Sequence, residues 1–360
     1  MKRLTLVLEE FNASGGLRVL SAVTNVAAGA NIDVAIVCPD YAAKPFFSLD
    51  PKVKLVIIST GRCMRRIRYL SAVCRMRWIY DGMFMTGNFR LISLITAVGR
   101  IAGREMPLFV IQGMDRVSLI ELTEASLIAK QINRILFAIS QRVPCHRVYV
   151  SRFLKVAYGQ PGAFIPNFVS NQFVQRSVSE ISSVIRIGCV CTSAPNKGFS
   201  LFLDAFARMN SDGCIGRNVE FFCATQDTIL IKKYSNSGVI FVKPNSDEAM
   251  YGFYRSCHIF TSLSVSEGFG LPALEAMASG CAIVCTDSGG VSDFLLDGYN
   301  GILLSERSGT AVAAALKQLV LNKALRLELA TAGQAYSKYY TYERFASGYL
   351  KLFQELGVSA

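Results

Sequence analysis

The stretch from Ser266 to Met277, SEGFGLPALEAM, decides the architecture of the second half of the chain. Before it, Ile259 to Leu263 is a short apolar run typical of a buried strand. Within and after it, Pro272 to Ser279 reads as a helix with proline near its start and Gly280 just past its end. Cys281 to Thr286 is again apolar, so the pattern predicts strand, glycine-rich bend, helix and strand, as in a parallel α/β sheet.

The residues of this bend suit a ligand that carries both hydroxyls and phosphates. Gly268 and Gly270 remove side chains where a ligand has to approach the backbone closely. The first-turn amides near Leu271 to Leu274 are expected to lack intrahelical partners, and with the helix dipole they favour an anion such as a diphosphate. Glu275 can bind a diol such as a ribose, while Glu267 faces whatever lies beyond the phosphates. One carboxylate per sugar, with phosphates between, describes a nucleotide-sugar.

A less specific interpretation applies to Glu275 taken alone. Acidic residues are common near helix starts, where they satisfy the helix dipole from the surface. The joint pattern of two glutamates, two glycines and a proline between a strand and a helix favours the binding site.

The run SEGFGLPALEAMASG, followed by DSGGVSDFLLDGYNGILL, resembles the glutamate-x7-glutamate signature of the retaining family 4 glycosyltransferases, which have the GT-B fold. Other matching segments are the pair Gly15-Gly16, the run IPNFV from Ile165 to Val169, and Asn196-Lys197-Gly198. The resemblance covers most of the chain. It implies an α/β protein of two doubly wound Rossmann-like domains that face each other across a cleft.

The resemblance also implies residue roles. In the family the first glutamate contacts the donor sugar and the second contacts the nucleotide ribose, while the glycine pair and a basic residue flank the diphosphate. Carried over, the catalytic residues are Glu267 and Lys197. The donor-binding residues are Gly15, Gly16, Lys197, Glu267, Gly268, Phe269, Gly270, Leu271 and Glu275. Family members are thought to retain configuration with the departing phosphate deprotonating the acceptor, so we name no general base.

One departure from the family pattern concerns phosphate binding. The family usually has an arginine a few residues before the Lys-Gly pair, and this chain has CVCTSAPNKG with Thr192 near that place. Either another basic residue replaces this cation, or diphosphate binding is weaker, or the alignment is shifted.

Composition predicts a two-domain cytoplasmic protein. The 360 residues are 51% apolar, enough for two cores. The start, MKRLTLVLEE, has too few apolar residues for a signal peptide. No run of about 20 apolar residues, as a membrane-spanning helix would need, occurs in the sequence. Eleven scattered cysteines fit free thiols in a reducing compartment, and two histidines make zinc improbable. No D-x-D triplet occurs, so we expect neither a metal nor another cofactor beyond the donor substrate.

The positive charge is concentrated in the first part of the chain. Residues 1–160 hold 22 Lys and Arg against 10 Asp and Glu, whereas residues 161–360 hold 16 of each. Much of the excess lies from Arg62 to Arg77, where arginines alternate with apolar residues and Trp78 follows. This stretch predicts one of two things. It is either a helix that binds an anionic membrane, at the inner face of the plasma membrane, or a helix whose charged face is solvated. Nucleic acid is not expected, because no recognition motif accompanies the charge.

The order of apolar runs and loops predicts the domains. In the first half the expected strands are Leu4 to Leu8, Asp33 to Cys38, Val53 to Ile58, Leu108 to Gln112 and Arg147 to Val150. In the second half they are Ile185 to Val190, Val219 to Cys223, Gly238 to Val242, Ile259 to Leu263 and Ala282 to Thr286. We expect an acceptor-binding domain over 1–165, a nucleotide-sugar-binding domain over 178–340, and a final helix in 341–360 that returns to the first domain.

The function expected from the resemblance is transfer of a hexose or deoxyhexose from a nucleotide-diphosphate sugar to a glycan or lipid-linked acceptor, with retention, in bacterial surface polysaccharide or lipopolysaccharide synthesis. Two alternatives stay open: a non-catalytic sugar-nucleotide or membrane-binding protein of the same fold, which Thr192 favours, and a sugar-nucleotide epimerase. A dehydrogenase is not expected, because the first loop, EEFNASGGLRV, lacks G-x-G-x-x-G.

Overall fold

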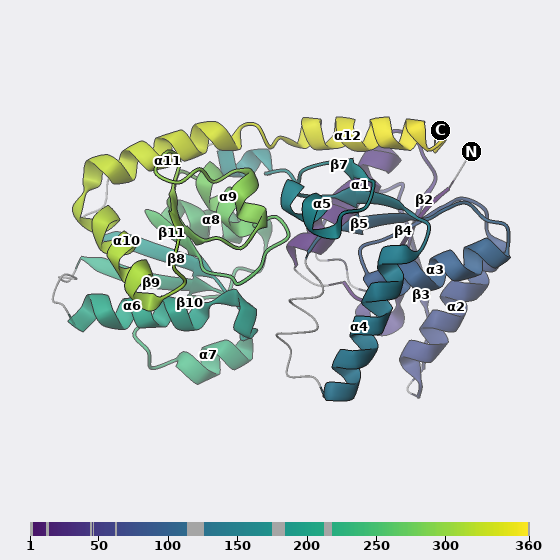
Figure 1. The fold of residues 1–360 in the computed structure, drawn as a ribbon, viewed down its shortest axis with the longest axis horizontal. Helices are drawn as coiled ribbons and strands as arrows, with labels where there is room; N and C mark the ends of the chain where they lie inside the picture. Colours follow the sequence, from purple (N-terminus) through teal and green to yellow (C-terminus); the bar gives the residue numbers. More distant parts are fainter. Residues whose placement is uncertain are drawn as a thin grey trace. The chain divides into compact units, whose positions relative to one another are not determined.

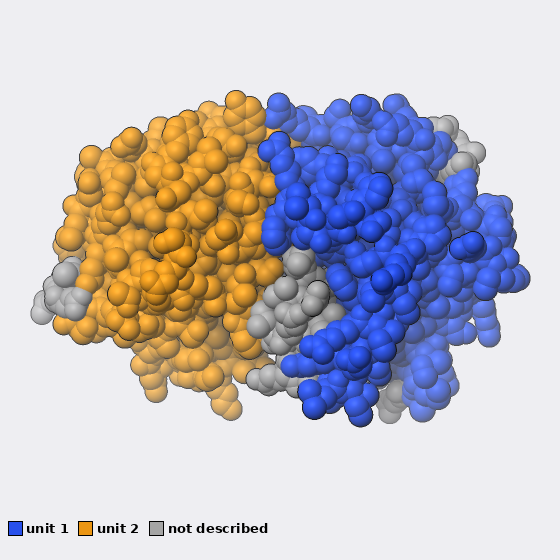
Figure 2. Space-filling view, in the orientation of Figure 1, with its two compact units in different colours: residues 1–167, 343–360 blue, residues 168–342 orange. Residues whose placement is uncertain are grey.

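The structure is a computed structural model, and the described part of the chain divides into two compact units. The described residues are 3–11, 14–43, 45, 47–61, 63–113, 126–174, 184–211 and 218–358. Unit 1 comprises residues 1–167 and 343–360, and unit 2 comprises residues 168–342 (Figure 2). Each unit contains one parallel sheet with helices (Figure 1).

Unit 1 is built on a sheet in the order β3-β2-β1-β4-β5-β6-β7, in which every neighbouring pair is parallel. Its strands are β1 (Leu4–Val7), β2 (Val34–Pro39), β3 (Lys54–Ile58), β4 (Met83–Thr86), β5 (Leu108–Ile111), β6 (His146–Tyr149) and β7 (Ala163–Phe164). Its helices are α1 (Gly15–Gly29), α2 (Arg65–Ile79), α3 (Phe89–Ile101), α4 (Leu127–Arg142), α5 (Arg152–Tyr158) and α12 (Tyr342–Glu355), whose first residue belongs to unit 2. Every residue of β1, β2, β4 and β5 is buried, as expected for strands covered on both faces.

Unit 2 repeats this plan with the order β10-β9-β8-β11-β12-β13, again parallel throughout. Its strands are β8 (Ile185–Val190), β9 (Val219–Ala224), β10 (Ile240–Val242), β11 (Ile259–Ser262), β12 (Ala282–Thr286) and β13 (Ile302–Leu304). Its helices are α6 (Phe199–Ser211), α7 (Thr228–Tyr234), α8 (Asp247–Ser256), α9 (Leu271–Ala278), α10 (Gly309–Leu321) and α11 (Lys323–Ser337). The prediction of two Rossmann-like α/β domains is confirmed.

The predicted strands all occur, with ends that differ by at most two residues. Among the described residues, the strands β4, β7 and β13 are not predicted from the sequence. β4 reads MFMT and holds neither Val nor Ile, while β7 and β13 have two and three residues. Pairing with neighbouring strands, rather than local composition, therefore defines these three elements.

The order of strands reverses at one place in each sheet. In unit 1, β1 to β3 follow one another toward one edge of the sheet, and β4 to β7 follow one another toward the other edge. β1 and β4 are therefore neighbours whose connections lead to opposite edges. In unit 2 the same holds for β8 and β11. Loops that leave the carboxyl ends of two such strands diverge and leave a crevice, which is where parallel α/β sheets usually bind ligands. None of the described helices is both long and apolar enough to cross a bilayer.

Candidate functional site

Glu267 joins the loops that follow β11 and β12. Its backbone N–H donates to the Ser288 carbonyl at 2.8 Å, and its own carbonyl accepts from the Gly290 N–H at 3.1 Å. Gly290 lies so close to the bend that a Cβ there would be 2.5 Å from the carbonyl carbon of Gly268. Gly270 ends the bend with φ +93°, a conformation that favours glycine. The glycines noted in the sequence therefore allow two loops to lie in direct contact.

The Glu267 carboxylate forms an ion pair with Lys197. Its Oε1 lies 2.7 Å from Lys197 Nζ and accepts a second hydrogen bond, also 2.7 Å, from Ser264 Oγ. Burial alone would lower the pKa of Lys197, but the charge and hydrogen bond of Glu267 outweigh it and raise the pKa above its ordinary value. The ammonium is therefore charged at any physiological pH. The predicted catalytic pair is thus brought into contact.

A short 3₁₀ turn, η4 (Pro195–Lys197), positions the lysine. The Val265 N–H donates to the Asn196 carbonyl at 2.8 Å, which attaches this turn to the loop after β11. Gly198 has φ +74°, and a Cβ there would lie 2.0 Å from the Leu263 carbonyl oxygen. Only glycine permits this close approach of backbone to backbone, which explains the Lys-Gly order.

Arg307 reaches the same place from the loop after β13. Its Nη2 donates to the Leu263 carbonyl oxygen at 3.1 Å, the atom against which Gly198 packs. Thr192 is exposed, and its Oγ1 accepts from the Ala194 N–H at 3.4 Å. Sequence reasoning missed Arg307, since it lies 110 residues beyond Lys197 along the chain. A basic residue thus stands beside the lysine turn although position 192 is not basic.

Glu275 is buried inside α9, with the residue only 6% exposed. Its Oε2 accepts a 3.0 Å hydrogen bond from the Tyr254 hydroxyl of α8. This burial excludes the interpretation of Glu275 as a surface residue satisfying the helix dipole. Tyr254 was missed in the sequence, because nothing local marks an aromatic residue 21 positions upstream as the partner of this carboxylate.

The expectation for the amides near Leu271 to Leu274 is wrong in part. Both the Ala273 and the Leu274 N–H donate to the Gly270 carbonyl, at 3.0 and 3.2 Å, and Pro272 has no N–H. The turn closes this early because Gly270 already bends the chain into the helix. An anion at this bend would therefore depend on Lys197 and Arg307 more than on a row of helix amides.

The glycine pair lies in unit 1, where α1 begins. Gly15 is the first residue of α1, and the preceding Ser14 caps the helix by accepting from the Leu17 N–H at 3.4 Å. Gly16 lines a cavity of about 480 Å³. Its other walls include the ends of β1 and β4 with the loops that follow them: Val7, Leu8, Glu9, Glu10, Thr86, Gly87 and Asn88. The cavity therefore occupies the crevice expected where the strand order of the sheet reverses.

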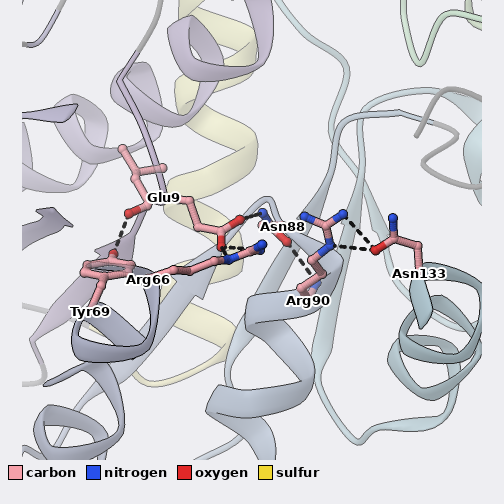
Figure 3. Close-up of polar contacts among 7 residues, drawn as sticks. Glu9, Arg66, Tyr69, Asn88, Arg90 and Asn133 are labelled. Carbon is pink, nitrogen blue, oxygen red and sulfur yellow. Dashed lines mark hydrogen bonds and ion pairs between the residues drawn. The ribbon is translucent and has the colours of Figure 1, made fainter. Parts of the chain in front are cut away.

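Glu9 is the centre of a polar group in this cavity (Figure 3). Its Oε1 lies 2.8 Å from Arg66 Nη2, and its Oε2 accepts from Asn88 Nδ2 at 2.6 Å. Arg90, also in the wall, donates to Asn133 Oδ1 at 2.8 and 3.1 Å. Sequence reasoning missed Glu9 as a site residue, although a glutamate directly after the first strand of a parallel sheet is the available signal.

The basic stretch from Arg62 to Arg77 does not form a single charged face. Arg62 lies outside the described residues. Arg77 is fully buried, donates to the Gly82 carbonyl at 3.3 Å and lies over the Phe84 ring. Arg66 is held by Glu9. Arg77 therefore packs in the interior of unit 1, and Arg66 lies in the wall of its cavity.

Comparison with known proteins supports this description. Residues 184–322 match the sequence profile of the family Glycosyl transferases group 1. An uncharacterized glycosyltransferase of Methanocaldococcus jannaschii is 28% identical over 168 residues, 45% of this chain and 46% of that protein. The D-inositol 3-phosphate glycosyltransferase of Corynebacterium jeikeium is 28% identical over 216 residues, 54% of this chain and 51% of that protein. The chain thus matches about half the length of these curated relatives.

Among solved structures, Anabaena HepE in complex with UDP and glucose has a similar fold, with a TM-score of 0.76. The two sequences are 15% identical, and the match covers 99% of this chain and 100% of that chain. At this identity the likeness concerns the fold alone. Together with the two parallel sheets, it confirms the predicted GT-B fold class.

Proposed function

We propose that this protein is a retaining glycosyltransferase of family 4 that moves a hexose or deoxyhexose from a nucleotide-diphosphate sugar to a glycan or lipid-linked acceptor. The contact between Lys197 and Glu267, at the bend that leads to the buried Glu275, carries the proposal. It places a charged ammonium after β8 and two carboxylates after the neighbouring strand β11. The family profile over residues 184–322 supports the same reading of this unit.

Each residue has a proposed role toward the donor. Glu275, oriented by Tyr254, binds the ribose hydroxyls, and Glu267 positions the donor sugar. Lys197 offsets the charge that builds on the departing diphosphate, which is electrostatic stabilisation of a leaving group. Arg307 supplies the second cation that Thr192 does not. Gly268, Phe269, Gly270 and Leu271 line the bend.

The cavity in unit 1 is the proposed acceptor site, with Gly15 and Gly16 at the donor phosphates. Its charged lining residues are two acids, Glu9 and Glu10, and two bases, Arg66 and Arg90. Balanced charges and amide groups favour a hydroxyl-rich sugar over a strongly anionic group. Glu9, held from two sides, is the group that accepts hydrogen bonds from acceptor hydroxyls.

The reaction needs no base from the protein, because the departing phosphate takes the proton from the acceptor hydroxyl. We propose that it needs no metal either, since Lys197 and Arg307 provide the positive charge that a metal would provide. The proposed setting is synthesis of a bacterial surface polysaccharide or lipopolysaccharide at the cytoplasmic face of the plasma membrane.

A thermal-shift panel with UDP, GDP, dTDP, CMP and ADP, with and without magnesium, tests the donor site. We expect one diphosphate to raise the melting temperature, also in EDTA, and Glu275→Ala to abolish the shift. Glu220→Ala, which removes a half-buried carboxylate of β9 paired with Arg186, is the control and keeps the shift. Slow release of the diphosphate from the donor without acceptor then separates a transferase from a non-catalytic module.

Two results would contradict the proposal. No shift with any nucleotide would favour the non-catalytic alternative, which the non-basic Thr192 supports. Conversion of the sugar without release of the nucleotide would indicate an epimerase.

A further inference from the structure

Helix α4 exposes apolar residues to solvent that a helix of a globular core would normally bury. Its two buried residues are Asn133 and Ser140. Four isoleucines that recur every three or four residues face solvent, and we call them the isoleucine stripe. They are Ile128 (75% exposed), Ile132 (52%), Ile135 (52%) and Ile139 (44%). Residues at this spacing lie on one face of a helix, so the exposed apolar surface is continuous.

Contacts on the opposite side of α4 show that this orientation is fixed. Asn133 accepts both hydrogen bonds from Arg90 of α3, as Figure 3 shows. Phe137 packs edge-on against Phe89, the first residue of α3, with ring centroids 5.9 Å apart. Rotating the helix to bury the isoleucine stripe would break both contacts. The stripe therefore faces outward because the opposite side of α4, through Asn133 and Phe137, is attached to α3.

The charges on α4 identify what covers the stripe. The helix carries Lys130, Arg134 and Arg142 and has no acidic residue between Leu127 and Arg142. Of these cations Arg134 and Arg142 are exposed and Lys130 is half-buried, and a second copy of the chain would place the exposed arginines against the same arginines, which is unfavourable. An anionic bilayer instead offers acyl chains to the isoleucines and phosphates to the cations. Leu127, 86% exposed at the start of the helix, extends the apolar surface.

We propose that α4 is a membrane-binding helix that inserts the isoleucine stripe into the interface of an anionic bilayer. The contact is made by α4 rather than by the arginine-rich α2, whose Arg77 is buried and whose Arg66 is held by Glu9. The inference is independent of the transferase activity proposed above, since it rests on a surface of unit 1 alone.

Flotation of the full-length protein with vesicles tests the inference. The parent is expected to float with vesicles of phosphatidylcholine mixed with phosphatidylglycerol, and much less with phosphatidylcholine alone. The partition coefficient of the double variant Ile132→Ser/Ile135→Ser onto these vesicles should be lower by about tenfold or more, because two isoleucine side chains no longer enter the bilayer interface. The double variant Arg134→Gln/Arg142→Gln, which removes the two exposed cations of α4, should lose the preference for the anionic lipid.

The matched control is Ile229→Ser/Leu321→Ser, which removes two aliphatic side chains of unit 2 that are 68% and 73% exposed. It should float like the parent, and all variants should keep the parent's melting temperature. Absence of flotation by the parent, or equal flotation of the stripe variant, would overturn the inference. The inference would also be overturned if the parent were a dimer that does not bind vesicles and the stripe variant were a monomer. A second copy of the chain would then be what covers the stripe.

Discussion

At the scale of single residues, Glu275 shows how burial restricts what a carboxylate can do. It is 6% exposed, and its Oε2 is fixed by the Tyr254 hydroxyl. A carboxylate withdrawn from water is stable only with hydrogen-bond partners, so its orientation is determined before any ligand arrives. Lys197 and Glu267 fix each other in the same way. Pre-oriented groups of this kind are what binding a ribose and a diphosphate requires.

Tyr254→Phe should therefore affect both stability and ligand binding. Loss of a hydrogen bond to a buried carboxylate is expected to lower the free energy of unfolding by about 1–3 kcal/mol. The dissociation constant of the diphosphate found in the thermal-shift panel should rise as well. Urea unfolding and calorimetric titration measure the two effects, with Tyr251→Phe of α8, whose ring packs on Phe173, as the control. An unchanged dissociation constant would reduce Tyr254 to a structural role.

At the scale of elements, the bend between β11 and α9 is held by backbone contacts with the loop after β12. Glu267 and Gly289 form an isolated bridge, and Gly290 leaves no space for a Cβ beside Gly268. The carboxylate of Glu267 is thus positioned by the pairing of two loops.

Gly290→Ala tests this arrangement. The added Cβ would meet backbone atoms at 2.5 Å, so the two loops must separate, at a cost of about 1–3 kcal/mol or more. Nucleotide binding should weaken together with the melting temperature. Gly252→Ala on α8, where no heavy atom lies within 4 Å of the new Cβ, should be neutral or stabilising. If both variants behaved alike in a thermal melt, the close contact of the loops would be refuted.

At the scale of the whole molecule, the last helix belongs to the unit that the first half of the chain builds. Residues 343–360 are part of unit 1, and Phe345, Tyr349 and Phe353 of α12 are buried. Gly348 packs near Ile165, where a Cβ would lie 3.1 Å from the isoleucine side chain. Unit 1 is therefore complete only when the end of the chain has been added.

Ending the chain after Tyr342 should destabilise unit 1 selectively. Removal of three buried aromatic side chains leaves apolar surface of unit 1 exposed. Hydrogen exchange should then accelerate in residues 3–167 and change little in residues 184–342. Uniform acceleration in both units would show that α12 stabilises the protein as a whole.

Most of the fold follows from the sequence, since buried parallel strands are continuous apolar runs that the chain displays locally. β4 is not predicted, because the residues MFMT do not favour a strand over a helix. Its place between β1 and β5 comes from pairing with these strands. Likewise the arginines between Arg62 and Arg77 were expected on one surface, whereas Arg77 is buried over Phe84. Local pattern does not specify which side of a helix packs inward.

The amino-acid sequence is enough to predict two Rossmann-like domains, and its pattern from Ser266 to Met277 places Glu267 and Glu275 on either side of one bend. It could do so because glycine, proline and strand signals act over a few residues. Three features become visible only in the folded protein: Arg307 reaches the lysine turn, Tyr254 orients Glu275, and α4 presents isoleucine rather than asparagine to solvent. These depend on contacts between residues far apart in the chain, whose free energies are fixed by packing and not by local sequence.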